Sequence, residues 1–275
     1  MIKHFIIIKN RWRIFSMNVQ NLFSLKGKTA LVIGGSKGIG KGIAKSLASA
    51  GASVVISSRS QKDCDISAST ITESTGNLCI GISADISTKS GINKLVAQTI
   101  ATLGHIDILV NSAGTTVRKP TIDFTEADWD RVQNVQLKGT FLACQAVGRH
   151  MIENHIQGRI INISSINARV VARPDIVSYV AAKGAVMQMT KALAVEWAQY
   201  GITVNALAPG FFETELTKVL MEVPSIREEL LRHIPAKRFG DPEVDFSGIA
   251  ICLAADSSQY ITGQIFYVDG GYTCI

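Results

Sequence analysis

A tyrosine and a lysine one helical turn apart form the most suggestive chemical pair in the chain. Tyr179-Val-Ala-Ala-Lys183 places a phenol and an ammonium group on one face of a predicted helix. A free phenol, with a pKa of about 10, stays protonated at neutral pH, whereas a nearby Lys⁺ lowers that pKa and favours the phenolate. The same spacing also fits an ordinary tyrosine beside a solvated lysine, so the pair alone proves little.

A serine upstream of this helix strengthens the chemical interpretation. Ser164-Ser165 ends the preceding predicted strand, so it adds a hydroxyl at the edge of a sheet. Converting an alcohol into a carbonyl needs a base for the hydroxyl proton, which Tyr179 can supply, and the hydroxyl of Ser165 can hold the substrate oxygen in place. The three residues therefore suit hydride transfer to or from a nicotinamide, whose positive oxidised ring also favours the phenolate.

A glycine-rich segment offers a place for such a cofactor. Directly after the first predicted strand, the chain reads Gly34-Gly35-Ser36-Lys37-Gly38-Ile39-Gly40 and then enters a predicted helix. Glycines allow a tight turn and bring backbone N–H groups close to a pyrophosphate, and the N-terminus of the helix favours an anion. Glycine turns between strand and helix are common, but the position after the first strand favours dinucleotide binding.

The elements that must position these residues follow a regular pattern. Helices are predicted to begin near Gly38, Gln61, Thr88, Thr125, Ser178 and Pro242, and Thr125-Glu-Ala-Asp128 matches a capping box. Short β-branched runs between them predict strands at 29–33, 53–57, 78–83, 108–111, 159–164, 203–206 and 265–268. Strict alternation of the two implies a parallel sheet covered on both faces. We therefore predict an α/β fold with one doubly wound Rossmann-type domain of about seven strands.

This domain is predicted to span residues 22–275, after a basic N-terminal extension at residues 1–21. The chain has 275 residues and a net charge of +6, but Lys3, Lys9, Arg11 and Arg13 of the extension account for most of the excess. The extension is either a targeting segment or the product of a start placed upstream of Met17. Because the rest of the chain is nearly balanced in charge, we expect no nucleic-acid partner.

The overall composition excludes several other classes of protein. With 47% hydrophobic residues the chain can bury a large core, and no apolar stretch approaches the ~18 residues that cross a bilayer. We therefore expect neither a disordered protein nor a membrane protein. His150 and His155 are five residues apart, unlike a metal-binding pair, so no metal site is expected. The five scattered cysteines favour reduced thiols and a cytoplasmic location: Cys64, Cys79, Cys144, Cys252 and Cys274.

Taken together in their order, these motifs resemble the short-chain dehydrogenase/reductase family. The resemblance covers about residues 22–275 and adds Asn111-Ser112-Ala113-Gly114, Pro209-Gly210 and the closing Val268-Asp269-Gly270-Gly271. It implies that Asp85 contacts the adenine, that Asn111 supports the strand beneath the cofactor, and that Thr214 borders the nicotinamide amide. It also implies a homotetramer. The cofactor-binding residues implied in addition are Gly34, Ser36, Lys37, Gly38, Ile39, Gly40, Ser58, Arg59, Ile86, Ala113, Gly114, Tyr179, Lys183, Pro209 and Gly210.

Cofactor choice has its own physical indicator. Enzymes that use NAD usually carry an acid at the end of the second strand, where it binds the ribose hydroxyls and repels a 2′-phosphate. Here Ser58 stands at that position, followed by Arg59, and Lys37 lies in the glycine segment. Both cations could be solvated surface charges, but together they can pair with a phosphate. We therefore predict that NADP(H) is preferred over NAD(H).

One catalytic position departs from the family pattern. Gln136 stands where the resemblance implies an asparagine that completes a catalytic tetrad with Ser165, Tyr179 and Lys183, at a helix kink that holds a water. Glutamine carries the same amide on one extra methylene, so it either reaches that water or displaces it. Impaired proton relay would make the chain an NADP(H)-binding protein with poor turnover, whereas a helix adapted to glutamine would leave a working enzyme.

Two arginines are candidates for binding the substrate. Arg118 follows the Asn111–Gly114 segment, and Arg173 lies in the loop before Tyr179. Either could be a solvated loop charge, or could clamp a carboxylate or phosphate bidentately, alongside Ser165. The segments 114–120, 209–216 and 266–272 most resemble the gluconate 5-dehydrogenase branch, which implies a small keto sugar acid as substrate. The 3-oxoacyl-carrier-protein reductase branch shares nearly all the motifs and is the alternative.

Overall fold

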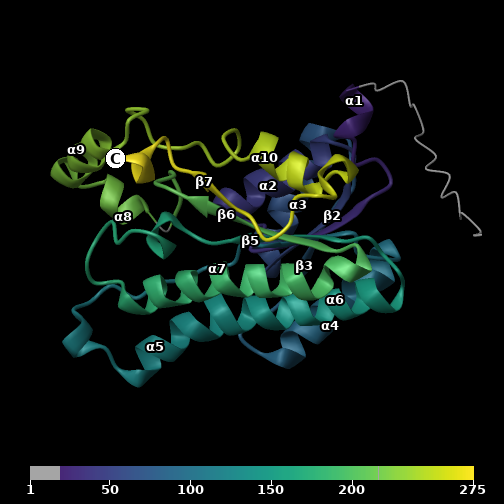
Figure 1. Cartoon of the computed structure of the whole chain (residues 1–275), viewed down its shortest axis with the longest axis horizontal. Helices are drawn as coiled ribbons and strands as arrows, with labels where there is room; N and C mark the ends of the chain where they lie inside the picture. The colour runs from purple at the N-terminus through teal and green to yellow at the C-terminus, as the bar shows by residue number, and fades with distance from the viewer. Residues whose placement is uncertain (1–18, 216) are drawn as a thin grey trace, which may run out of the picture.

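A parallel sheet organises the molecule. The computed structural model describes residues 19–215 and 217–275. The sheet has seven strands in the order β3-β2-β1-β4-β5-β6-β7, and all neighbouring strands are parallel (Figure 1). The predicted α/β fold is confirmed. Each predicted strand coincides with an observed one, and their ends differ by at most three residues. The strands are β1 (Thr29–Ile33), β2 (Ser53–Ser58), β3 (Cys79–Ser83), β4 (Ile108–Asn111), β5 (Arg159–Ile163), β6 (Thr203–Pro209) and β7 (Ile265–Val268).

Helices cover both faces of the sheet, which explains why the central strands are apolar throughout. β1, β4, β5 and β6 are buried along their whole length. In Figure 1, α2, α3 and α10 lie on one face and α4 to α7 on the other, while α8 and α9 stand at one end near the C-terminus. The helices are α1 (Val19–Leu22), α2 (Gly38–Ser49), α3 (Gln61–Thr75), α4 (Lys89–Leu103), α5 (Glu126–Gln133), α6 (Thr140–Glu153), α7 (Val177–Trp197), α8 (Lys218–Met221), α9 (Pro224–His233) and α10 (Ser247–Ala254).

Local sequence signals account for several helix boundaries. The capping box predicted at Thr125 is confirmed, because the Thr125 side chain accepts from the Asp128 backbone and the Asp128 side chain accepts in return. The helix start predicted near Pro242 is wrong, since α10 begins at Ser247. Side chains hold the intervening turn instead: Asp241 accepts from the backbone of Glu243, and Asp245 accepts from the backbone of Asp241.

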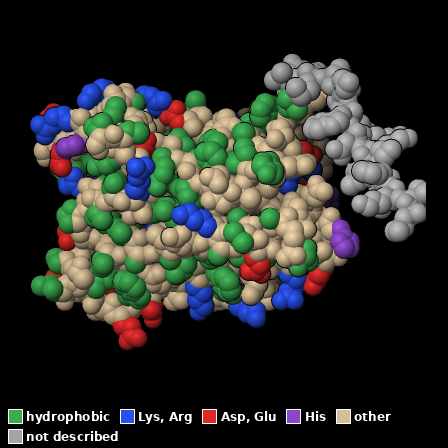
Figure 2. Space-filling model, in the orientation of Figure 1, with side chains coloured by type: hydrophobic (Ala, Val, Ile, Leu, Met, Phe, Trp, Pro, Cys, Tyr) green, Lys and Arg blue, Asp and Glu red, His purple; other side chains and the backbone are tan. Residues whose placement is uncertain are grey.

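Three features of the structure relate to the expected absence of membrane and nucleic-acid partners and to the N-terminal extension. Within the described residues, none of the helices combines the length and the apolar character needed to cross a bilayer. On the face drawn in Figure 2, Lys and Arg side chains are scattered among acidic, apolar and neutral ones. The predicted N-terminal extension falls mostly on residues 1–18, which lie outside the described part of the chain, and its last three residues belong to α1.

Candidate active site

The glycine segment turns at the carboxyl end of β1 because two of its positions leave no room for a side chain. Gly34 has a φ of +82°, and a Cβ there would collide with the backbone of Ala113 in the loop after β4. A Cβ on Gly40 would collide with the carbonyl oxygen of Gly34. The backbone N–H groups of Gly34 and Gly35 both donate to the Ser57 carbonyl, at 2.7 and 3.1 Å. The segment is thereby pressed against the loop after β4, at the edge where β1 separates β2 from β4.

The first turn of α2 presents free backbone donors at this edge. Lys37 is the N-cap residue, and its own side chain makes no capping hydrogen bond. Ser36 is buried, and its carbonyl accepts a 2.7 Å hydrogen bond from Ser67 of α3, which holds the segment in place. Ile39 follows in the first turn of α2, and the Cβ position of Gly38 lies 3.2 Å from Cγ2 of Thr214. The structure therefore brings Thr214 next to the glycine segment, and its expected position at the nicotinamide amide stays a prediction.

The residues expected around the adenosine end lie at the ends of β2 and β3. Ser58 ends β2 and its carbonyl accepts from Ala84, which places the loop of Asp85 and buried Ile86 beside it. The Asp85 carboxylate accepts hydrogen bonds from the backbone and side chain of Ser87, which lower its pKa, with a smaller effect from the Arg59 charge. Arg59 itself is exposed.

Lys37 has a partner that the sequence did not indicate. Its ammonium lies 3.0 Å from the carboxylate of Asp63, in the first turn of α3. The hydrogen bond and charge of Asp63 raise the pKa of Lys37, and Glu215 adds to the effect. The cation expected to meet a 2′-phosphate is therefore already paired with a carboxylate.

Asn111 ties the end of β4 to the neighbouring strand. Its Nδ2 donates to Oδ1 of Asn162 on β5 at 2.9 Å, and Asn162 in turn donates to Thr190 of α7. The amide oxygen of Asn111, like the Ser57 hydroxyl, is buried without a hydrogen-bond partner among the described residues. This buried network fits the supporting role that the resemblance implies for Asn111, with Ala113 and Gly114 in the loop that follows.

Ser165, Tyr179 and Lys183 are brought together where β5 ends and α7 begins. Lys183 donates from Nζ to the Ile163 carbonyl at 2.7 Å, and Ser164 donates to the Lys183 carbonyl at 3.1 Å, so α7 is fastened to the end of β5. The Lys183 Nζ lies 5.6 Å from the centroid of the Tyr179 ring. Ser165 and Lys183 are buried, and Tyr179 is half-buried.

Ionisation in this cluster differs from the sequence-based expectation. Burial raises the pKa of the Tyr179 phenol above 10, against the lowering effects of the Ser165 hydroxyl and the Arg118 charge. Burial also lowers the pKa of Lys183 to about 7. The expected lowering of the Tyr179 pKa is therefore wrong for the protein alone, because removal from water outweighs the Ser165 hydrogen bond and the Arg118 charge.

Gln136 sits in the kink that the resemblance implies. Residues 134–139 form a π-helical segment between α5 and α6, and such segments bend a helix. The Gln136 side chain is 1% exposed and donates from Nε2 to the Thr115 carbonyl at 2.7 Å, while its Oε1 is buried without a partner among the described residues. The amide nitrogen therefore holds the loop that leads to Arg118, while the amide oxygen is left as a buried acceptor that a ligand or water can use.

The two candidate substrate arginines lie on loops that touch. The backbone of Lys119 donates to the Asp175 carbonyl at 3.1 Å, which joins the loops of Arg118 and Arg173. Arg118 lies close enough to Tyr179 and Arg173 for their charges to interact. Arg173 is ion-paired at 3.2 Å with Glu229 of α9, a residue that the sequence did not single out. No local signal could have identified Glu229, because α9 reaches Arg173 only through the tertiary fold.

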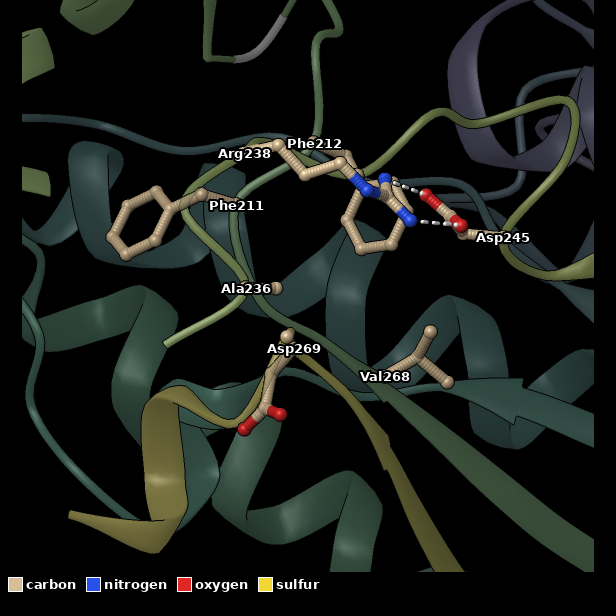
Figure 3. Close-up of a pocket in the computed structure, with 9 residues that line it drawn as sticks. Phe211, Phe212, Ala236, Arg238, Asp245, Val268 and Asp269 are labelled. Carbon is tan, nitrogen blue, oxygen red and sulfur yellow. Dashed lines mark hydrogen bonds and ion pairs between the residues drawn. The ribbon is translucent and has the colours of Figure 1, made fainter. Parts of the chain in front are cut away.

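The segment after β6 is held against the C-terminal part of the chain. Gly210 follows Pro209 and donates to the Val268 carbonyl at 2.9 Å, and Phe211 packs edge-on against Tyr272. Behind this segment is a small pocket of about 130 Å³ in which Arg238 pairs bidentately with Asp245 (Figure 3). None of Ser165, Tyr179 or Lys183 lines this pocket. The pocket is therefore separate from the Ser165–Tyr179–Lys183 cluster.

The residues present fit a dinucleotide. The uncapped first turn of α2 offers backbone N–H donors to a phosphate, beside glycines that let a ligand approach closely. This turn, the ends of β2 and β3, and the Ser165–Tyr179–Lys183 cluster all lie along the carboxyl edge of one sheet, where ligands bind in doubly wound folds. Within the described residues, no group of His, Cys, Asp or Glu side chains is arranged to hold a metal ion.

Comparison with known proteins gives consistent matches over nearly the whole chain. A family model described as enoyl-(acyl carrier protein) reductase matches residues 34–273. The gluconate 5-dehydrogenase of Gluconobacter oxydans (strain 621H) is 39% identical over 257 residues, covering 94% of this chain and 99% of that protein. The 2-dehydro-3-deoxy-D-gluconate 5-dehydrogenase of Dickeya dadantii (strain 3937) is 39% identical over 263 residues, covering 92% and 98%.

A solved structure is similar throughout as well. The crystal structure of a gluconate 5-dehydrogenase from Burkholderia cenocepacia J2315, in complex with NADP and tartrate, matches with a TM-score of 0.88 and 38% identity. The match covers 94% of this chain and 99% of that one.

Proposed function

This chain belongs to the short-chain dehydrogenase/reductase family and is an NAD(P)-dependent oxidoreductase, and from that premise we propose that it interconverts a keto sugar acid and its secondary alcohol with NADP(H). The observation that carries the proposal is the cluster of Ser165, Tyr179 and Lys183 with Arg118 close to the phenol. It combines a proton-transferring group with a cation that can bind an acid.

In this proposal Tyr179 moves the proton. The bound nicotinamide supplies or accepts the hydride. During reduction, the Tyr179 hydroxyl donates its proton to the substrate oxygen as the carbonyl becomes an alcohol, and during oxidation the phenolate takes that proton back. Ser165 donates a hydrogen bond that fixes the same oxygen. Lys183, with a pKa of about 7, can exchange a proton near neutral pH.

The proposed substrate class follows from the arginines and the relatives. Both relatives named above act at position 5 of a gluconate, according to their names. A sugar acid carries a carboxylate that a guanidinium can bind bidentately. Arg173 is already ion-paired with Glu229, so we assign binding of the substrate carboxylate to Arg118. Arg173 lies close to Arg118. The best candidate is therefore the 5-keto form of a gluconate.

One assay separates this proposal from its alternative. NADPH oxidation is followed at 340 nm with 5-keto-D-gluconate and with a 3-oxoacyl thioester under the same conditions. The proposal expects turnover with the sugar acid at a kcat/KM at least tenfold higher. A preference for the thioester would favour the acyl-carrier branch, which the description of the matching family model also names. Binding of NADPH without turnover of any carbonyl would favour the impaired-turnover alternative.

Preference for NADP(H) is part of the same proposal. The B. cenocepacia neighbour binds NADP, and Lys37 at the start of α2, with Ser58 and Arg59 at the end of β2, are the residues that we expect to meet a 2′-phosphate. Ser58 is neutral, so the end of β2 does not repel a phosphate.

We further propose that the chain works as a cytoplasmic homotetramer. The sequence of α7 is apolar around most of its circumference, yet Val195 on this helix is 83% exposed, and Phe141 of α6 and Trp129 of α5 are about 40% exposed. Such side chains favour burial against another copy. Light scattering of the purified enzyme tests the assembly, and a monomeric mass at micromolar concentration would contradict it. The buried free thiols of Cys64, Cys79 and Cys144 agree with a reducing compartment.

A further inference from the structure

Asp63 lies where the proposed cofactor pocket meets α3, and its carboxylate holds the cation that a 2′-phosphate would need. We propose that Asp63 is a specificity-determining residue that competes with the 2′-phosphate for Lys37 and thereby keeps NAD(H) usable. This inference rests on the proposed phosphate pocket of Lys37, Ser58 and Arg59.

The geometry of the pair is fixed from both sides. Lys37 occupies the N-cap position of α2 at the glycine segment, and its Nζ lies 3.0 Å from Oδ2 of Asp63. The backbone N–H of Asp63 donates to the N-cap residue Ser60 at 3.2 Å, so the residue is held in the first turn of α3. Ser67, one turn further along α3, donates to the Ser36 carbonyl at 2.7 Å. The helix that carries the acid is thus fastened to the segment that carries the lysine.

Charge balance explains why the acid should discriminate between the two cofactors. The pocket offers two cations, Lys37 and Arg59, while Asp63 and the more distant Glu215 both act on Lys37. A 2′-phosphate brings nearly two negative charges, so it must either share the ammonium with Asp63 or displace it, and the two anions repel each other. NAD(H) has a neutral hydroxyl at that position and leaves the Lys37–Asp63 pair intact.

The position of this acid is also informative. The end of β2 carries neutral Ser58, so the carboxylate nearest to the proposed phosphate cation comes instead from five residues further on, in α3. Asp63 is about one-third exposed and Lys37 is 61% exposed, so solvent and salt weaken their interaction without removing it. The expected effect on cofactor choice is therefore moderate, and it should shrink as ionic strength rises.

Cofactor binding tests the inference without any substrate. Dissociation constants for NADPH and NADH are measured by fluorescence titration of the full-length enzyme at low salt, for the wild type, Asp63→Asn and Lys37→Met. Asp65→Asn is the matched control, because it removes the same charge from the same helix, where Asp65 accepts a hydrogen bond from Gln61. We expect Asp63→Asn to tighten NADPH binding about 3- to 10-fold and to leave NADH binding within twofold, with no change for Asp65→Asn.

The variants separate failure of this inference from failure of the pocket. Lys37→Met should weaken NADPH binding at least tenfold and spare NADH. If it does so while Asp63→Asn leaves NADPH affinity unchanged, the role of Asp63 is overturned and the pocket stands. If Lys37→Met has no effect on NADPH, the proposed phosphate pocket is wrong and the inference falls with it. Weaker NADH binding by Asp63→Asn, with NADPH unchanged, would make Asp63 a ribose ligand and would also overturn the inference. Thermal unfolding of each variant confirms that it is folded.

Discussion

The buried amine of Lys183 should make the stability of the fold depend on pH in a way that one substitution can reveal. Lys183 is 5% exposed, and its Nζ donates to the Ile163 carbonyl. Burial lowers its pKa from 10.5 to about 7. Between these values the unfolded chain binds a proton that the folded chain has released, so the destabilisation caused by this group shrinks and the fold gains stability as the pH rises from 7 toward 10.5. Below pH 7 the folded protein carries the full cost of a buried charge.

The size of the effect follows from the displacement of the pKa. Lowering it from 10.5 to about 7 corresponds to a cost of about 5 kcal/mol for the charged form at pH 6, of which about 2 kcal/mol remains at pH 9. Lys183→Met removes the charge and keeps an unbranched, slightly shorter side chain. The variant should therefore gain stability over the wild type, and the gain should be about 3 kcal/mol larger at pH 6 than at pH 9.

Urea unfolding of both proteins at pH 6 and pH 9, at one protein concentration, measures this difference. Packing changes caused by methionine are the same at both pH values and cancel, as does the titration of His150, whose pKa burial lowers in both proteins. If the variant and the wild type differ in unfolding free energy by the same amount at both pH values, Lys183 does not have the lowered pKa on which the prediction rests. The variant should have lost turnover at both.

Three further substitutions test the surroundings of the cluster. Gln136→Asn should destabilise the fold by about 2 kcal/mol in urea unfolding, because it gives up the hydrogen bond to the Thr115 carbonyl and leaves a methylene-sized gap; a rise in kcat would instead support the impaired-relay hypothesis. Arg59→Ala should raise the KM for NADPH about tenfold and leave NADH kinetics nearly unchanged, and a wild type that prefers NADH tenfold would contradict the proposed preference. Arg118→Gln should raise the KM for 5-keto-D-gluconate by about 10- to 100-fold with an unchanged KM for NADPH, and an unchanged sugar-acid KM would remove Arg118 from the substrate site.

Features with a local cause were predictable from the sequence. The strands are short buried runs, the capping box at Thr125 lies within four residues, and the spacing of Tyr179 and Lys183 is set by one helical turn. The glycine segment was recognisable because its glycines are close together and directly follow the first strand, and the clash of a Gly40 Cβ with the Gly34 carbonyl is itself local. Each of these depends on residues near one another in the sequence.

Features that depend on distant segments were not predictable. Asp63 pairs with Lys37 and Glu229 with Arg173 only because α3 and α9 are folded against loops far away in the sequence. The direction of the Tyr179 pKa was mistaken for a related reason, since a sequence shows the neighbouring charge but not the loss of water. The missed turn at 242–246 arises from side-chain hydrogen bonds of two aspartates that compete with a helix.

The most direct test of the account is the turnover of 5-keto-D-gluconate with NADPH by the wild type and by Tyr179→Phe. The substitution keeps the ring and removes the oxygen that transfers the proton. The account predicts that the wild type reduces the sugar acid, that kcat falls by about 10²-fold or more in the variant, and that the dissociation constant for NADPH stays within twofold. A variant that keeps more than about a tenth of wild-type kcat, well short of that scale, would show that Tyr179 is not the proton-transferring group.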